Sequence, residues 1–212
     1  MGLINYICQA LWQTILFLLI GVLPWIAVAL VMQLLSNSIR KSLAKIFGIQ
    51  GYIYLTAPGV MIHEIGHAVF CLIFRHKIVE MKLFSPEEDG TLGYVNHSYN
   101  PNSFYQRIGN FFIGIAPIVV GGLAVTLFVR ILTPWMYNSM MSEFSKVVAA
   151  DGAQVPVQIV KGAGAIFLSF FKLSNFSNWR WWVCIVLAFA IAIHMEISNS
   201  DIKGGLKGLG VI

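Results

Sequence analysis

The segment from residue 49 to residue 74 reads IQGYIYLTAPGVMIHEIGHAVFCLIF, and the interpretation of the whole chain starts from it. Apart from Glu64, the segment carries no charged side chain. The regular helix is expected from about residue 58 to residue 74, because proline is tolerated in the first turn of a helix. An ionisable residue in such an apolar span costs at least ~2.5 kcal/mol unless it faces a partner or a wet cavity. His63, Glu64 and His67 therefore indicate a functional site.

The composition places most of the remaining chain in lipid as well. Of the 212 residues, 58% are hydrophobic and 11% are charged, and the mean hydropathy is +0.76. A soluble domain is about 45–50% apolar and about 25% charged, so a soluble domain, a disordered chain and a disulfide-rich scaffold are excluded. The net charge of +5 comes from basic residues at the ends of apolar runs, which suits lipid headgroups and predicts no nucleic-acid partner. We expect an integral membrane protein in contact with the lipid bilayer.

The predicted fold class is mainly α: a polytopic membrane helical bundle of about four to five spans, treated as one domain over residues 1–212. A membrane-associated β-hairpin is expected between the second and third spans. Its strands are predicted at 78–84 and 91–97, and the turn residues Ser, Pro, Asp and Gly at 85–90 separate them. The other spans are predicted at residues 11–35, 108–129 and 181–195.

The single domain is expected to divide into four consecutive parts. Residues 1–48 hold the first span and a basic connector, and residues 49–132 hold the H-E-x-x-H span, the hairpin and the third span. Residues 133–179 are a variable insertion, and residues 180–212 hold the fourth span and a segment that contains Asp201.

The pattern His63-Glu64-Ile65-Gly66-His67 predicts a zinc site. Residues four apart lie on one face of a helix, so both imidazoles can point at one Zn²⁺ ion about 2.0–2.1 Å away. Glu64 is the expected catalytic residue, because it is close enough to take a proton from water that zinc activates. These residues carry the H-E-x-x-H mechanism, with one zinc per chain.

Two histidines do not complete a catalytic zinc site, which usually has three protein ligands. The remaining candidates are Asp201, Glu196 and His194. His194 could instead be an interior histidine bonded to a neighbouring helix, and the two acids could be solvated helix caps. The residues alone leave these alternatives open.

An H-E-x-x-H motif inside a span, followed by a hairpin, a span rich in small residues and a late aspartate, resembles the site-2 protease family of intramembrane zinc metalloproteases. The resemblance covers roughly residues 50–130 and 180–210. It implies that Asp201, in the sequence NSDIKGG at 199–205, is the third zinc ligand ahead of Glu196. Ile202 and Lys203 stand where the family usually has glycine. The resemblance also implies that the hairpin offers a strand edge to an unwound substrate.

Six further residues receive structural interpretations. Cys71 and Cys184, like Cys8, lie in or beside apolar runs and are expected to be small buried hydrophobic residues, forming neither disulfides nor a cysteine-type zinc site. His76 and His97 are expected to be interfacial polar residues and not ligands. Asn110, at the start of the third span, could bind a substrate carbonyl or cap the helix, and we favour the cap.

The leading functional prediction is a zinc-dependent intramembrane endopeptidase. Its substrates would be membrane proteins, cut in or near their transmembrane segments, and the compact chain suggests a multi-pass protein of a prokaryotic cell membrane. One alternative is a proteolytically inactive membrane protein that keeps the metal site for binding or regulation. A less favoured alternative is a metal or proton transporter.

Overall fold

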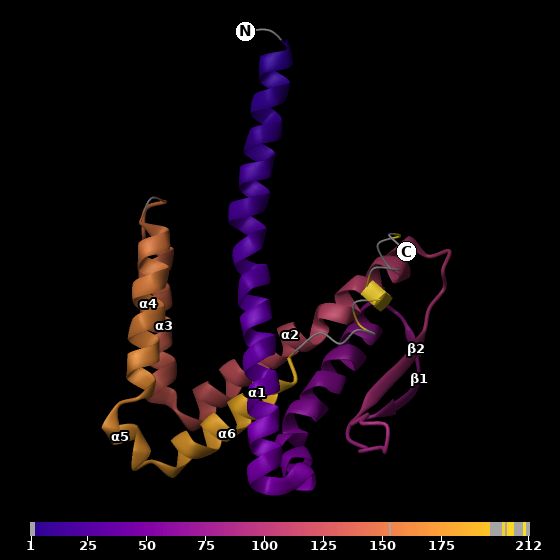
Figure 1. Ribbon diagram of the computed structural model, residues 1–212, viewed down its shortest axis with the longest axis vertical. Helices are drawn as coiled ribbons and strands as arrows, with labels where there is room; N and C mark the ends of the chain where they lie inside the picture. Colours follow the sequence, from indigo (N-terminus) through magenta and orange to yellow (C-terminus); the bar gives the residue numbers. More distant parts are fainter. Residues whose placement is uncertain (1–2, 153, 196–200, 202, 206–209, 211–212) are drawn as a thin grey trace. The chain divides into compact units, whose positions relative to one another are not determined.

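The structure is a computed structural model that describes residues 3–152, 154–195, 201, 203–205 and 210 (Figure 1). Its contacts divide the chain into two compact units, residues 1–52 and residues 53–212. The described elements are α1 (Leu3–Ile73), β1 (Lys77–Lys82), β2 (Tyr94–Ser98), α2 (Phe104–Leu132), α3 (Pro134–Val148), α4 (Val155–Phe170), α5 (Leu173–Phe176) and α6 (Trp179–Ile193). The protein is therefore mainly helical with one antiparallel pair of strands, as predicted.

The first unit is helical through residues 36–47, which the sequence marks as a connector between spans. The helical angles of α1 are interrupted at Gly48, with φ 73° and ψ 165°. Glycine takes a positive φ without the steric penalty that a Cβ brings. The interruption falls at the predicted boundary at residue 48.

The predicted helix start at residue 58 is wrong. Helical backbone follows Gly48 and continues through Pro58 to Ile73. Proline removes one backbone donor, and a long apolar helix tolerates this where its neighbours satisfy the freed carbonyl. Gly48, which breaks the helical angles, sets the start instead.

The end of α1 turns the chain directly into the hairpin. Arg75 has a φ of 59°, its N–H donates to the carbonyl of Leu72 (3.1 Å), and the N–H of His76 donates to the carbonyl of Cys71 (2.8 Å). This pair of hydrogen bonds is a Schellman motif, which usually has glycine where Arg75 stands. The cap brings residues 71 and 76 close together.

The hairpin is confirmed, with shorter strands than predicted. β1 and β2 pair from Lys77 opposite Ser98 to Lys82 opposite Tyr94, with an irregularity between Ile78 and Glu80. In the turn, the backbone N–H of Thr91 donates to Asp89 (2.9 Å), and this bond lowers the pKa of that carboxyl.

Within the second unit, small residues let the part of α1 after residue 53 approach other helices of the same unit. A methyl group on Gly66 would lie 3.2 Å from the backbone nitrogen of Pro117 in α2, and the ring of Phe74 stacks on that of Phe112 with centroids 5.1 Å apart. Close approach at small residues is a common way for membrane helices to pack. Farther along α2, a buried cluster joins α2, α3 and α6 through Val129, Met136, Trp181 and Cys184.

Two described helices are long and apolar enough to cross a membrane: Leu34–Ile73, which contains Gly48, and Phe104–Leu132. The predicted fourth span corresponds to α6, whose 15 residues extend about 22 Å at 1.5 Å per residue. The predicted insertion at 133–179 holds α3, α4 and α5. A bundle of four to five spans stays a prediction.

The contact between α1 and α6 gives the first testable prediction. A methyl group on Gly59 would lie 2.0 Å from the carbonyl oxygen of Ala190. We expect Gly59→Ala to reduce the free energy of unfolding by about 1–3 kcal/mol, because the backbones must separate. Thermal unfolding of the detergent-purified protein measures this change.

Gly164→Ala in α4 is the matched control, since, apart from the neighbouring backbone of its own helix, no described atom lies within 4 Å of the added methyl group. It should raise the free energy of unfolding by about 0.5–1 kcal/mol through helix propensity. Equal effects of the two substitutions would contradict the close approach of α1 and α6.

Candidate metal centre

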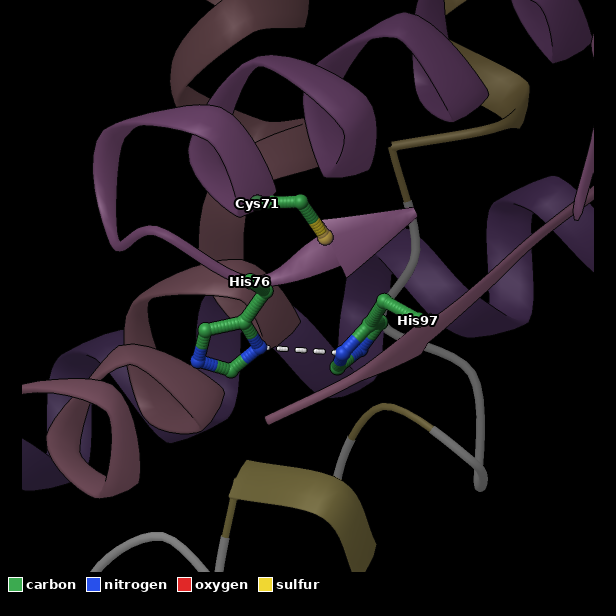
Figure 2. A group of neighbouring side chains, drawn as sticks. All are labelled: Cys71, His76 and His97. Atoms are coloured by element: carbon green, nitrogen blue, oxygen red, sulfur yellow. Dashed lines mark hydrogen bonds between the residues drawn. The ribbon is translucent and has the colours of Figure 1, made fainter. Parts of the chain in front are cut away.

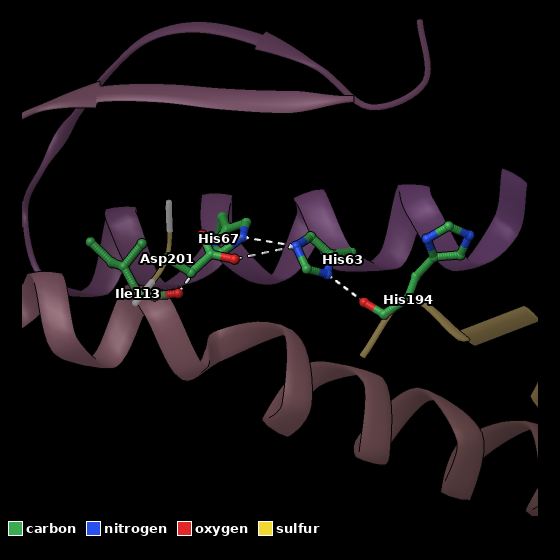
Figure 3. Close-up of polar contacts among 5 residues, drawn as sticks. All are labelled: His63, His67, Ile113, His194 and Asp201. Atoms are coloured by element: carbon green, nitrogen blue, oxygen red, sulfur yellow. Dashed lines mark hydrogen bonds and ion pairs between the residues drawn. The ribbon is translucent and has the colours of Figure 1, made fainter. Parts of the chain in front are cut away.

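Three side chains that the sequence proposes as ligands converge on one point. The Nε2 atoms of His63 and His67 are 3.1 Å apart. The carboxylate of Asp201 lies 3.4 Å from Nε2 of His67 and 3.9 Å from Nε2 of His63 (Figure 3). Two nitrogen ligands on a tetrahedral zinc ion, each at 2.0–2.1 Å, lie about 3.3 Å apart. The observed spacing fits one ion with small adjustments.

Backbone carbonyls fix the orientation of both imidazole rings. Nδ1 of His63 faces the carbonyl oxygen of His194, and Nδ1 of His67 faces that of Ile113 at 2.9 Å (Figure 3). A carbonyl oxygen can only accept, so both Nδ1 atoms carry the hydrogen and both Nε2 atoms present a lone pair. Metal-binding histidines are commonly oriented in this way by a partner on the other ring nitrogen.

The converging atoms form a strongly electron-rich group. Two imidazole lone pairs and a carboxylate meet, and none of these atoms supplies a hydrogen to the others in this tautomer. A bound cation removes the resulting repulsion. Nitrogen and carboxylate ligands of this kind suit Zn²⁺, with a fourth position left for water or substrate.

Glu64 borders the same cavity as the three candidate ligands, His63, His67 and Asp201. The cavity has a volume of about 380 Å³, and Glu64 is 7% exposed. Its Cγ atom would lie 3.0 Å from a methyl group on Gly93, so the hairpin packs directly on it. The residues that line the cavity are His63, Glu64, His67, Gly93, Tyr94, Val95, Asn96, His97, Asn110, Ile113, Gly114, Asp201 and Gly204.

The strand β2 forms one wall of this cavity, together with Gly93 just before it. Burial lowers the pKa of His97 on this strand, and the neighbouring His76 and His67 lower it further. The ring of His97 is therefore held in its neutral form. The sequence predicted the hairpin but not which of its strands faces the cavity.

The prediction that Asn110 caps the third span is wrong. The helix α2 begins at Phe104, and Ser103 is its N-cap, with its hydroxyl accepting from the N–H of Gln106. Asn110 therefore lies inside the helix, where it is buried, lines the cavity and donates to the carbonyl of Arg107 (3.3 Å). The first turn of α2 holds the polar residues Gln106 and Arg107, so hydropathy alone placed the start too late.

The other candidate residues have mixed outcomes. His194 contributes its backbone carbonyl to the orientation of His63, and Glu196 lies outside the described residues. Cys71 and Cys184 are buried as predicted, whereas the side chain of Cys8 is outside the described part. His76 is buried, 4% exposed, and its location at the membrane interface stays a prediction.

Comparisons with models of protein families, with characterised proteins and with solved structures find no match to this chain. The resemblance to the site-2 protease family therefore remains an expectation that rests on the motifs.

The position of Asp201 gives the second testable prediction. A methyl group on Gly114 would lie 2.9 Å from the backbone oxygen of Asp201. We expect Gly114→Ala to displace the carboxylate and weaken zinc binding by about 10–100-fold, as for other changes that misorient a ligand. Competition with a zinc chelator of known affinity measures the change.

Gly122→Ala on the same helix is the control, because nothing lies within 4 Å of its added methyl group. Zinc affinity should be unaltered in this variant. An unaltered affinity in Gly114→Ala as well would mean that Asp201 does not bind the ion.

Proposed function

We propose that this protein is a zinc-dependent intramembrane endopeptidase that hydrolyses peptide bonds in or near the transmembrane segments of other membrane proteins. The observation that carries the proposal is the meeting of His63, His67 and Asp201 beside Glu64 in one cavity. The H-E-x-x-H part of this group lies on a helix that is long and apolar enough to cross a membrane. The proposed protein is multi-pass, with the bilayer and a membrane-protein substrate as its partners.

The chain's own residues supply the proton transfers. When bound, Zn²⁺ polarises a carbonyl group and makes water more acidic. Glu64 takes a proton from the attacking water and later gives it to the amine nitrogen that leaves, so the carboxylate is restored after each cycle. The amide of Asn110, on the cavity wall, is available to bind a carbonyl oxygen of the substrate.

The hairpin supports a peptide as the substrate. Among the described residues, β2 pairs with β1 alone, so its other edge has backbone groups available for a further strand. Residues 93–97 line the cavity. A substrate segment that unwinds and pairs there would present an extended backbone to Glu64, which is the usual geometry of strand addition.

The alternatives account for less of this arrangement. A proteolytically inactive regulator would be favoured by an aspartate far from the histidines. In the structure, the carboxylate of Asp201 lies 3.4 Å from Nε2 of His67 and 3.9 Å from Nε2 of His63. A metal or proton transporter would use the same ligands, but it gives no role to Glu64 packed beside them under Gly93. Hydrolysis uses all four residues.

The third prediction separates hydrolysis from metal binding. Glu64→Gln keeps the size of the side chain and removes its ability to accept a proton. We expect the zinc content of Glu64→Gln to equal that of the wild type and cleavage to fall by at least about 10²-fold. Metal analysis and cleavage of labelled casein in detergent, together with a single-span reporter protein in vesicles, measure both quantities.

His67→Ala should lose cleavage together with the zinc ion held by His63, His67 and Asp201, and a chelator should abolish wild-type cleavage until zinc is restored. Wild-type protein that holds zinc but cuts neither substrate would favour the regulatory alternative. Cleavage that persists in Glu64→Gln would refute the assigned role of this carboxylate.

A further inference from the structure

A second group of side chains that can bind a metal lies apart from His63, His67 and Asp201. Cys71, His76 and His97 each offer a ligand atom, and these atoms all lie within 4.8 Å of one another (Figure 2). Cys71 comes from the last turn of α1, His76 from the connection that follows it, and His97 from β2. Three separate segments of the chain thus meet at this point.

The cap of α1 explains how the first two residues come together. In a Schellman motif, the side chains at the positions of Cys71 and His76 are the pair that normally makes a hydrophobic contact. Here these positions hold a thiol and an imidazole, and the hydrogen bond between the N–H of His76 and the carbonyl of Cys71 is 2.8 Å long. The backbone therefore sets two potential ligands side by side.

His76 is oriented as a metal ligand would be. Its Nε2 faces the carbonyl oxygen of Gln106 at 2.7 Å, so this nitrogen carries the hydrogen and Nδ1 presents a lone pair. The ring of Tyr99 stacks on His76, with centroids 5.2 Å apart and an interplanar angle of 16°. A carbonyl partner on the second ring nitrogen is the usual support of a histidine that binds a metal.

The Nδ1 atom of His76 points to Nδ1 of His97, 3.0 Å away (Figure 2). The side chains of Cys71 and His76 are buried, with 0% and 4% exposed, while His97 is half-buried and borders the cavity. An ion could therefore reach the group from the side of His97. Cys184 is also buried, and within the described part of the chain its sulfur accepts a hydrogen bond from the hydroxyl of Thr133 at 3.8 Å.

We propose that Cys71, His76 and His97 bind a second Zn²⁺ ion, with water as the fourth ligand, and that this ion fastens β2 to the end of α1. The two nitrogens at 3.0 Å need to separate to about 3.3 Å, and the sulfur must come within about 3.6 Å of each of them. The thiol proton of Cys71 is released to solvent when the ion binds. A thiolate and two imidazoles are ligands that zinc readily accepts.

Cobalt substitution tests this site separately from the first one. The His63, His67 and Asp201 set contains no sulfur, so absorption from thiolate-to-Co²⁺ charge transfer can come only from a cysteine. We expect the wild type to take up about two Co²⁺ ions per chain and to show this absorption. Cys71→Ser should bind one ion fewer, lose the charge-transfer absorption and keep the weaker bands of cobalt at the first set.

A variant with Cys8→Ser and Cys184→Ser is the matched control, because Cys71 is then the only cysteine of the three. It should keep both ions and the absorption. Loss of the absorption in this variant, its persistence in Cys71→Ser, or its absence from cobalt-loaded wild type would each overturn the second site. Uptake of one ion with the absorption present would support the second site and contradict the first.

X-ray absorption at the zinc edge avoids any substitution of Cys71, in case that variant does not fold. In His67→Ala, which disables the first set, the remaining zinc should have one sulfur neighbour at about 2.3 Å and nitrogen neighbours at about 2.0–2.1 Å. Zinc with no sulfur neighbour, or no zinc at all, would show that His76 and His97 are only a hydrogen-bonded pair.

Discussion

Two backbone carbonyl oxygens, those of Ile113 in α2 and His194 at the end of α6, hold the imidazoles of α1 in the orientation that the proposed chemistry needs. For these oxygens to reach the rings, α2 and α6 must lie very close to α1. Gly66 and Gly59 make this approach possible, because a side chain at either position would meet the neighbouring backbone. The close packing of these helices therefore also determines how the two imidazole rings are oriented. The spacing of the two histidines alone would not produce the site.

In the second set, which consists of Cys71, His76 and His97, a backbone carbonyl of α2 also orients an imidazole ring. The carbonyl of Gln106, in the first turn of α2, fixes His76 as the carbonyl of Ile113 fixes His67. A backbone carbonyl oxygen has two lone pairs and can accept a second hydrogen bond. The carbonyl of Ile113 also lacks its usual helical donor, because Pro117, four residues later, has no N–H. The helix α2 therefore orients one histidine of each set.

The sequence predicted what depends on local pattern. The spacing of His63 and His67, the hairpin between turn residues, and the apolar run of α2 are all visible without a structure. What it missed depends on contacts between distant segments or on one backbone angle: the helix runs from Gly48 through Pro58, Asn110 is interior and not a cap, and Cys71 on α1 lies near His97 on β2. The sequence gives no spacing signal for this cysteine and the two histidines, because the helix cap sets Cys71 beside His76 and the strand pairing adds His97.

The hairpin connects the two sets physically. Residues 93–97 form a wall of the cavity beside Glu64, and His97, within that stretch, also belongs to the second set. A two-stranded sheet is marginally stable by itself in water, so the position of this wall depends on what anchors it. The half-buried ring of His97 lies against that of His76 after the end of α1, with centroids 4.9 Å apart. The edge of β2 that does not pair with β1 stays available within the described structure. A fixed wall with an open edge is what binding an extended peptide requires, because ordering the strand beforehand reduces the entropy lost when the peptide binds.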